Sequence, residues 1–163
     1  MEIINYFDVD DKIFWKEEIG KSDWGAGQYL YRLLNNNQLL DLCGNSTKVL
    51  MLVEGKTLIS FCTLAEQDDV RDTSLTPWIG QDDVRDTSLT PWIGFVYTFP
   101  EFRGHRYLGK LLEYAKNVAA SEGATHIYIS TNHIGLYEKY GYSFYKLMKD
   151  DENQDSRVYK INL

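Results

Sequence analysis

A change of hydrophobic period near residue 107 is the feature that most constrains this fold. Residues 95–99 are β-branched or aromatic, and Pro100 ends the run because proline cannot donate a hydrogen bond to a sheet. Further along, apolar residues recur every three or four positions, at Leu108, Leu111, Leu112, Ala115, Val118 and Ala119. Gly123 then provides a helix C-cap. The sequence therefore predicts a strand, a loop and an amphipathic helix in succession.

The segments on either side of this unit predict a mixed α/β fold. The remaining expected elements are helices at 10–20 and 24–36, a hairpin of strands at 49–53 and 57–64, a strand at 126–131, a short helix at 132–140, and a closing pair of strands at 142–148 and 157–161. Glu54-Gly55-Lys56 is typical of a tight hairpin turn, and Gly141 is expected to end the short helix.

An identical tandem repeat interrupts the expected sheet. Residues 67–80 read QDDVRDTSLTPWIG and recur unchanged at 81–94, within a single domain spanning 1–163. Two units are too few for a solenoid, so the repeat indicates a recent in-frame duplication or an artefact, and one copy fewer leaves 149 residues. We expect Trp92-Ile93-Gly94 to enter the sheet while the first copy forms an excursion near the cleft. The alternative is that either copy can pair as the start of the strand. This would allow a register slip in the sheet or an exchange of the segment between protomers.

Charge and composition exclude several classes of protein. The chain has a net charge of −7 and no block dense in Lys and Arg, which argues against a nucleic-acid partner. No apolar run approaches the roughly 20 residues of a membrane span, and the acidic N-terminus does not resemble a signal peptide, so we expect a cytoplasmic protein without a membrane partner. Cys43 and Cys62 lack the spacing of a zinc site or a disulfide framework, and no metal is expected.

The loop before the strong helix is a candidate anion site. Residues 100–110, PEFRGHRYLGK, contain two glycines and four potential cations. Free N–H groups of a first helical turn and the positive end of the helix dipole suit a pyrophosphate. A solvated turn before a helix has the same composition, so the spacing alone leaves both interpretations open.

Two separated motifs resemble those of the GCN5-related N-acetyltransferase (GNAT) superfamily. Residues 99–105, FPEFRGH, followed by Leu111-Leu112, are similar to its P-x-x-R-G-x-G-x-G-x-x-L-L signature, and residues 132–142, NHIGLYEKYGY, are similar to its N-x-x-x-L-Y-x-K-x-G-F segment. The resemblance covers nearly the whole chain. It implies the GNAT fold: a mostly antiparallel mixed sheet of about six to seven strands, about four flanking helices, and a V-shaped split between the two central strands.

The resemblance also implies acetyl-CoA as acyl donor. By position, the pantetheine arm would lie along Val96, Tyr97 and Thr98. The expected contacts of the phosphates are Arg103, Gly104, His105, Arg106, Leu108, Gly109 and Lys110, and Asn132 is a further cofactor contact.

The sequence departs from the family pattern in the loop. Arg106 stands where the family usually has its central glycine, and Leu108 stands where a second small residue is usual. We expect the loop to survive if φ at Arg106 stays negative, with the guanidinium adding charge beside the phosphates. The alternative is that Arg106 points to solvent and the loop is reshaped.

In the implied mechanism, an amine attacks the thioester directly. Tyr137 matches the tyrosine that acts as general acid near the CoA sulfur, and its alternative role is that of a core tyrosine. His133 is the candidate base, because histidine titrates near neutrality and this one is expected to begin the helix bearing Tyr137. Its alternative is a helical residue that moves no proton. Tyr97 is a candidate for the acceptor side of the strand.

The expected activity is acetyl transfer to a primary amine of a small molecule. The chain's acidity favours a cationic amine by electrostatic complementarity, and we expect a monomer or homodimer. Two alternatives remain: an N-acetyltransferase acting on proteins or peptides, and a non-catalytic acyl-CoA-binding regulatory module.

Overall fold

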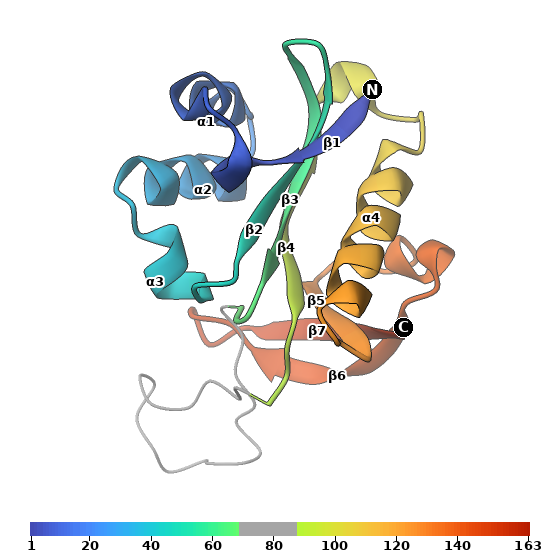
Figure 1. Ribbon diagram of the computed structural model, residues 1–163. Coiled ribbons are helices and arrows are strands. Elements are labelled where there is room, and N and C mark those ends of the chain that lie inside the picture. Colours follow the sequence, from blue (N-terminus) through green and yellow to red (C-terminus); the bar gives the residue numbers. More distant parts are fainter. Residues whose placement is uncertain (69–87) are drawn as a thin grey trace.

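The computed structural model describes residues 1–68 and 88–163, which form a single sheet flanked by helices (Figure 1). The strands are β1 (Glu2–Asn5), β2 (Lys48–Glu54), β3 (Thr57–Ala65), β4 (Trp92–Thr98), β5 (His126–Thr131), β6 (Ser143–Lys149) and β7 (Asp155–Asn162). The α-helices are α1 (Lys12–Gly20), α2 (Gly25–Asn35), α3 (Leu39–Cys43) and α4 (Tyr107–Ser121). Short 3-10 helices are η1 (Tyr6–Asp8), η2 (Pro100–Phe102) and η3 (Tyr137–Tyr140).

The sheet is antiparallel except at its centre. The strand order is β1-β2-β3-β4-β5-β7-β6, and β4 with β5 is the parallel pair. Helices α1, α2 and α3 cover one face, and α4 crosses the other (Figure 1). These observations confirm the expected mixed fold with its mostly antiparallel sheet.

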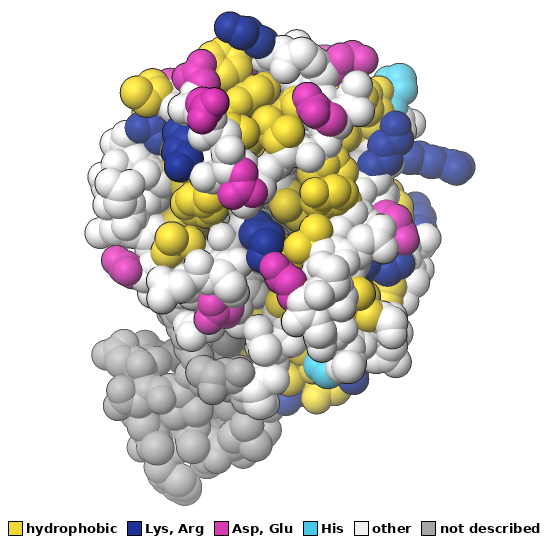
Figure 2. Space-filling view, viewed as in Figure 1, with side chains coloured by type: hydrophobic (Ala, Val, Ile, Leu, Met, Phe, Trp, Pro, Cys, Tyr) yellow, Lys and Arg dark blue, Asp and Glu magenta, His cyan; other side chains and the backbone are white. Residues whose placement is uncertain are grey.

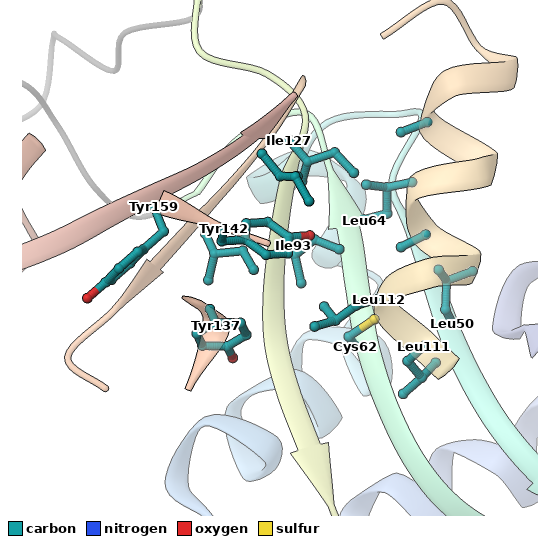
Figure 3. Close-up of a cluster of buried hydrophobic side chains, with 14 of the residues drawn as sticks. Leu50, Cys62, Leu64, Ile93, Leu111, Leu112, Ile127, Tyr137, Tyr142 and Tyr159 are labelled. Carbon is teal, nitrogen blue, oxygen red and sulfur yellow. The ribbon is translucent and has the colours of Figure 1, made fainter. Parts of the chain in front are cut away.

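Two hydrophobic cores lie on opposite faces of the sheet because side chains alternate along each strand. In β2, Leu50 and Leu52 belong to the core beneath α4, whereas Val49, Met51 and Val53 belong to the core beneath α1 and α2. Figure 3 shows the α4-side core, in which Leu111 and Leu112 of the helix meet strand residues such as Cys62. Strands covered on both faces read as continuous apolar runs, which is the pattern of β2 and β3.

Most expected elements are found close to their predicted bounds, including the helix from residue 107 and the closing strand pair. The expected helix over 132–140 is wrong in its first half. Only Tyr137–Tyr140 is helical, because Gly135 adopts a φ of +84° that interrupts any earlier turn. Gly141, with a φ of +91°, ends η3 as predicted. The short elements β1 and α3 carry too few residues to show a period and were not expected.

The second repeat copy supplies the start of β4. Trp92 and Ile93 pair with β3 on one side and with β5 on the other, and Gly94 pairs with Thr63, so the expectation for Trp92-Ile93-Gly94 is confirmed. The predicted excursion of the first copy falls almost wholly on residues 69–80, which lie outside the described residues.

Acidic and basic side chains are interspersed on the face shown in Figure 2, in keeping with a sequence that lacks a dense cationic block. Among residues 1–68 and 88–163, no helix has the length and apolar character needed to cross a membrane. Within the same ranges, no three His, Cys, Asp or Glu side chains gather as a metal site would require.

Candidate active site

The two central strands separate soon after they meet. β4 and β5 pair only at Trp92 with Tyr128 and at Ile93 with Ile129, and the strands then diverge. A cleft of about 730 Å³ opens at this point, which we call the β4–β5 cleft. Its walls come from the α1–α2 loop, β4, the loop before α4 with the start of that helix, the end of β5 and the η3 segment. The expected V-shaped split is therefore present, and it positions backbone and side chains from five segments around one space.

A backbone irregularity in β4 accompanies the split. Phe95 has a φ of +48°, in the left-handed region that residues other than glycine rarely adopt. The β3–β4 register shifts across the same stretch, between Phe61 and Thr63, as it does at a β-bulge. Because a bulge bends its strand, this feature accounts for β4 leaving β5 directly after Ile93.

The loop before α4 has a different backbone from the one expected. Arg106 has a φ of +60°, so the condition of a negative φ is not met, and the residue occupies the left-handed conformation that glycine adopts without strain. Gly104 is also left-handed, with a φ of +83°. Arg106 is the N-cap of α4, and no side chain of a described residue caps the helix there. The loop therefore keeps a glycine-like shape and adds a guanidinium at the cleft wall.

The expected cofactor contacts divide into two groups. Those that line the β4–β5 cleft are Val96, Tyr97, Thr98, Arg103, Gly104, Arg106 and Leu108. His105, Gly109 and Lys110 are not among the lining residues. His105 stacks on Tyr107, with ring centroids 5.5 Å apart. A Cβ at Gly109 would lie 2.9 Å from the ring of Tyr140, so glycine there allows α4 to pack against η3.

Tyr137 lies at the boundary between the cleft and the α4-side core. It lines the cleft, yet only 4% of its surface is exposed, and Figure 3 shows it among the buried side chains of this core. Burial raises the pKa of its phenol above the usual 10, with smaller contributions from Cys62 and Tyr140. Its hydroxyl therefore keeps its proton at neutral pH, as a proton donor must.

His133 and Asn132 lie in the irregular segment between β5 and η3. His133 is exposed and lines the cleft, but it precedes η3 by four positions, so the expectation that it begins this helix is wrong. Its backbone N–H donates to Thr131 Oγ1 at 3.1 Å. Asn132 lines a neighbouring pocket rather than the cleft.

This neighbouring pocket, of about 290 Å³, combines aromatic rings with carboxylates, and we call it the acidic pocket. Its rings are Trp24, Tyr29, Trp92 and Phe95, and its carboxylates are Asp68, Asp150 and Asp151. The residues shared with the β4–β5 cleft are Trp24, Gly94, Phe95, Ser130 and Thr131, so the two spaces meet where the strands part. From the sequence, residues 150–156 were expected only to connect the closing strands at 142–148 and 157–161.

Asp23 and Tyr97 form a second feature that sequence reasoning missed. The Tyr97 hydroxyl donates to Asp23 Oδ1 at 2.5 Å, and the Asp23 backbone N–H donates to the same hydroxyl at 3.4 Å. Trp24 stacks on Tyr97 with the ring planes 7° apart. Burial, followed by the hydrogen bond to Asp23, raises the pKa of Tyr97. The α1–α2 loop is therefore fixed to β4 at the wall of the cleft.

Solved structures similar to this chain are acyltransferases. An aminoglycoside 6'-N-acetyltransferase complexed with coenzyme A is 13% identical with a TM-score of 0.65, and the match covers 99% of this chain and 97% of that one. The aminoglycoside 6'-N-acetyltransferase from Enterococcus faecium is 12% identical with a TM-score of 0.66 and the same coverage. An acyl-CoA N-acyltransferase from Pseudomonas aeruginosa is 17% identical with a TM-score of 0.61, covering 98% and 96%. At these identities the likeness establishes the fold.

Sequence comparison establishes the family. No curated protein sequence matches the chain. The sequence model described as "Acetyltransferase (GNAT) family" matches residues 12–142, which include α1, the split strands, the loop before α4 and Tyr137. The chain therefore belongs to the GNAT family of acetyltransferases.

Proposed function

We propose that this protein transfers the acetyl group of acetyl-CoA to a primary amine of a small molecule. The observation that carries the proposal is the meeting of two different spaces at the point where β4 and β5 part. One is the larger cleft, whose lining includes Arg103 and Arg106, and the other is a small acidic pocket. A donor and an acceptor approaching from these two sides would meet at the split.

The β4–β5 cleft suits acetyl-CoA. Beyond Ile93 the β5-facing edge of β4 has no partner strand among the described residues, so its backbone groups are available to an extended amide-containing chain. Arg103 and Arg106 of the loop before α4 also line the cleft, where an anionic pyrophosphate would gain charge-assisted hydrogen bonds. The coenzyme A complex of a structural neighbour supports this choice of donor.

Tyr137 suits the role of proton donor to the leaving sulfur. The acceptor nitrogen attacks the thioester carbon as a neutral amine, and the thiolate that departs is stabilised when it takes a proton. A phenol, whose pKa is ordinarily about 10, is protonated throughout the neutral range, so Tyr137 has a proton to give.

The acidic pocket suits a cationic amine acceptor. Three carboxylates line it beside four aromatic rings, and a desolvated ammonium is attracted both to carboxylates and to ring faces. Its volume of about 290 Å³ lies at the small end of ligand sites, which favours a small acceptor over a folded protein. Two structural neighbours act on aminoglycosides, which supports a small amine as the class of acceptor.

The test is CoA release from acetyl-CoA in the presence of separate acceptors: polyamines, aminoglycosides, amino acids and peptides. We expect turnover with at least one small cationic amine and none with N-acetylated forms of the same compounds, which are the matched controls. Binding of CoA without turnover on any amine would contradict the proposal and favour a non-catalytic acyl-CoA-binding module. Turnover with peptides alone would favour a protein or peptide acetyltransferase.

A further inference from the structure

The loop between α1 and α2 is held in a defined position at the cleft. Gln28 Nε2 donates to the carbonyls of Gly20 and Ser22, at 2.6 Å in both cases. Gly27 packs so tightly that a Cβ would lie 2.2 Å from Ser22 Oγ. Together with the bond between Tyr97 and Asp23, these contacts fix the Asp23 side chain at the cleft wall.

Asp23 is the one carboxylate among the described residues that line the β4–β5 cleft. Tyr97 occupies Oδ1, and no described residue makes a hydrogen bond with Oδ2. The carboxylates Asp68, Asp150 and Asp151 line the acidic pocket instead. An amine lying at the split therefore has the Asp23 Oδ2 atom as the nearby carboxylate of the cleft itself.

Asp23 and Tyr137 approach the cleft from opposite sides of the sheet. Tyr97, which holds Asp23, belongs to the core beneath α1 and α2, whereas Tyr137 belongs to the core beneath α4. Direct transfer is faster when one group takes the proton of the attacking nitrogen and another gives a proton to the departing sulfur. Asp23 and Tyr137 have this arrangement.

We propose that Asp23 is a catalytic residue, whose carboxylate contacts the acceptor nitrogen and takes the proton that this nitrogen loses after attack. The inference rests on the proposed acetyl transfer, and it assigns to Asp23 the proton-accepting role for which the sequence suggested His133. A carboxylate at this place stabilises the positive charge that the nitrogen gains as its bond to carbon forms, so it favours the transition state over the neutral ground state.

The proton and electron balance is complete. The acceptor ammonium loses one proton to water, and its lone pair forms the bond to the thioester carbon. The positively charged nitrogen then passes a second proton to Asp23, the C–S bond breaks with its electron pair leaving on sulfur, and the sulfur takes the Tyr137 proton. Asp23 releases its proton to water and Tyr137 regains one, so an ammonium and acetyl-CoA yield an amide, CoA and one proton.

Steady-state kinetics of Asp23→Asn, Asp23→Glu and Tyr97→Phe test the role. We expect Asp23→Asn to lower kcat/KM for the amine on the order of 10- to 100-fold, the effect of losing a hydrogen bond to a charged group, with KM for acetyl-CoA within about twofold. Asp23→Glu, which keeps the carboxylate, should retain more activity than Asp23→Asn. Tyr97→Phe removes the hydroxyl that bonds the Asp23 side chain and backbone but keeps the carboxylate, so it should cost less than about fivefold.

Asp10→Asn is the matched control, because Asp10 is an exposed aspartate that does not line the cleft. An Asp23→Asn variant as active as Asp10→Asn would overturn the role. So would a Tyr97→Phe variant as impaired as Asp23→Asn, because Asp23 would then serve only to anchor the loop. The wild-type chain separates the two proposals: no CoA release with any amine contradicts acetyl transfer itself, whereas active wild type beside equally active Asp23→Asn removes only Asp23.

Discussion

The two halves of the sheet differ in how far their strands pair. β2 and β3 pair from Lys48 with Leu64 to Glu54 with Thr57, over their whole length, and both faces of the pair are covered. β4 and β5 pair at one end only and then enclose a cleft. Full pairing satisfies the backbone within the protein, whereas partial pairing leaves backbone groups for a ligand. We therefore expect substitutions in the first half to alter stability and substitutions around the second to alter binding and rate.

The largest expected effect is a loss of stability when the fully paired strands β2 and β3 are altered. Leu50 of β2 is 1% exposed beneath α4, so Leu50→Ala removes buried surface and leaves a cavity. The free energy of unfolding should fall by about 3 kcal/mol, measured by urea denaturation. Leu147→Ala on the exposed face of β6 is the control and should change it by less than about 0.5 kcal/mol. Equal effects of the two substitutions would show that burial of Leu50 beneath α4 does not stabilise the β2–β3 pair.

An effect of nearly this size, on kcat, is expected at the β4–β5 cleft. Tyr137→Phe should lower kcat about 100-fold, equivalent to about 2.7 kcal/mol, with the affinity for CoA unchanged, because only the proton donor is lost. Tyr142→Phe is the matched control. Tyr142 is also buried, its hydroxyl has no hydrogen-bond partner among the described residues, and it does not line the cleft. An unchanged kcat in Tyr137→Phe would exclude the acid role.

Arg106→Gly separates backbone strain from charge. Glycine adopts the φ of +60° without a Cβ clash, so the free energy of unfolding should rise by about 1 kcal/mol. Loss of the guanidinium should weaken CoA binding about tenfold, measured by calorimetry, if Arg106 reaches the phosphates as proposed. Lys116→Ala on the same helix, where Lys116 pairs with Glu113, should leave CoA affinity unchanged. Unweakened CoA binding by Arg106→Gly would place the guanidinium in solvent.

The smallest expected effect concerns the connection between the two halves. Residues 66–91 join β3 to β4, and deletion of residues 67–80 shortens this connection by one repeat copy while leaving β4 intact. The lower cost of closing a shorter loop should raise the free energy of unfolding by about 0.7 kcal/mol, with kcat retained. A loss of activity in the deletion variant would show that the additional copy contributes to the site.

The sequence by itself determined the elements and their order wherever the cause is local. The change of period at residue 107 predicts α4, Pro100 and Gly141 mark the ends of elements, and the motif around Tyr137 indicates the GNAT family. These signals depend on neighbouring residues, whose spacing can be read along the chain. Short elements such as β1 were not predicted, because a few residues are too short a stretch to show a hydrophobic period.

Only the tertiary structure decided how the site is assembled. Asp23 meets Tyr97 across 74 positions of sequence, and Asp68 lines the same pocket as Asp150, which no local pattern connects. The left-handed backbone of Arg106 was not predicted from an arginine, because the conformation is imposed by the entry into α4 rather than preferred by the residue. The sequence thus determined which segments surround the cleft, whereas packing decided which side chains face it.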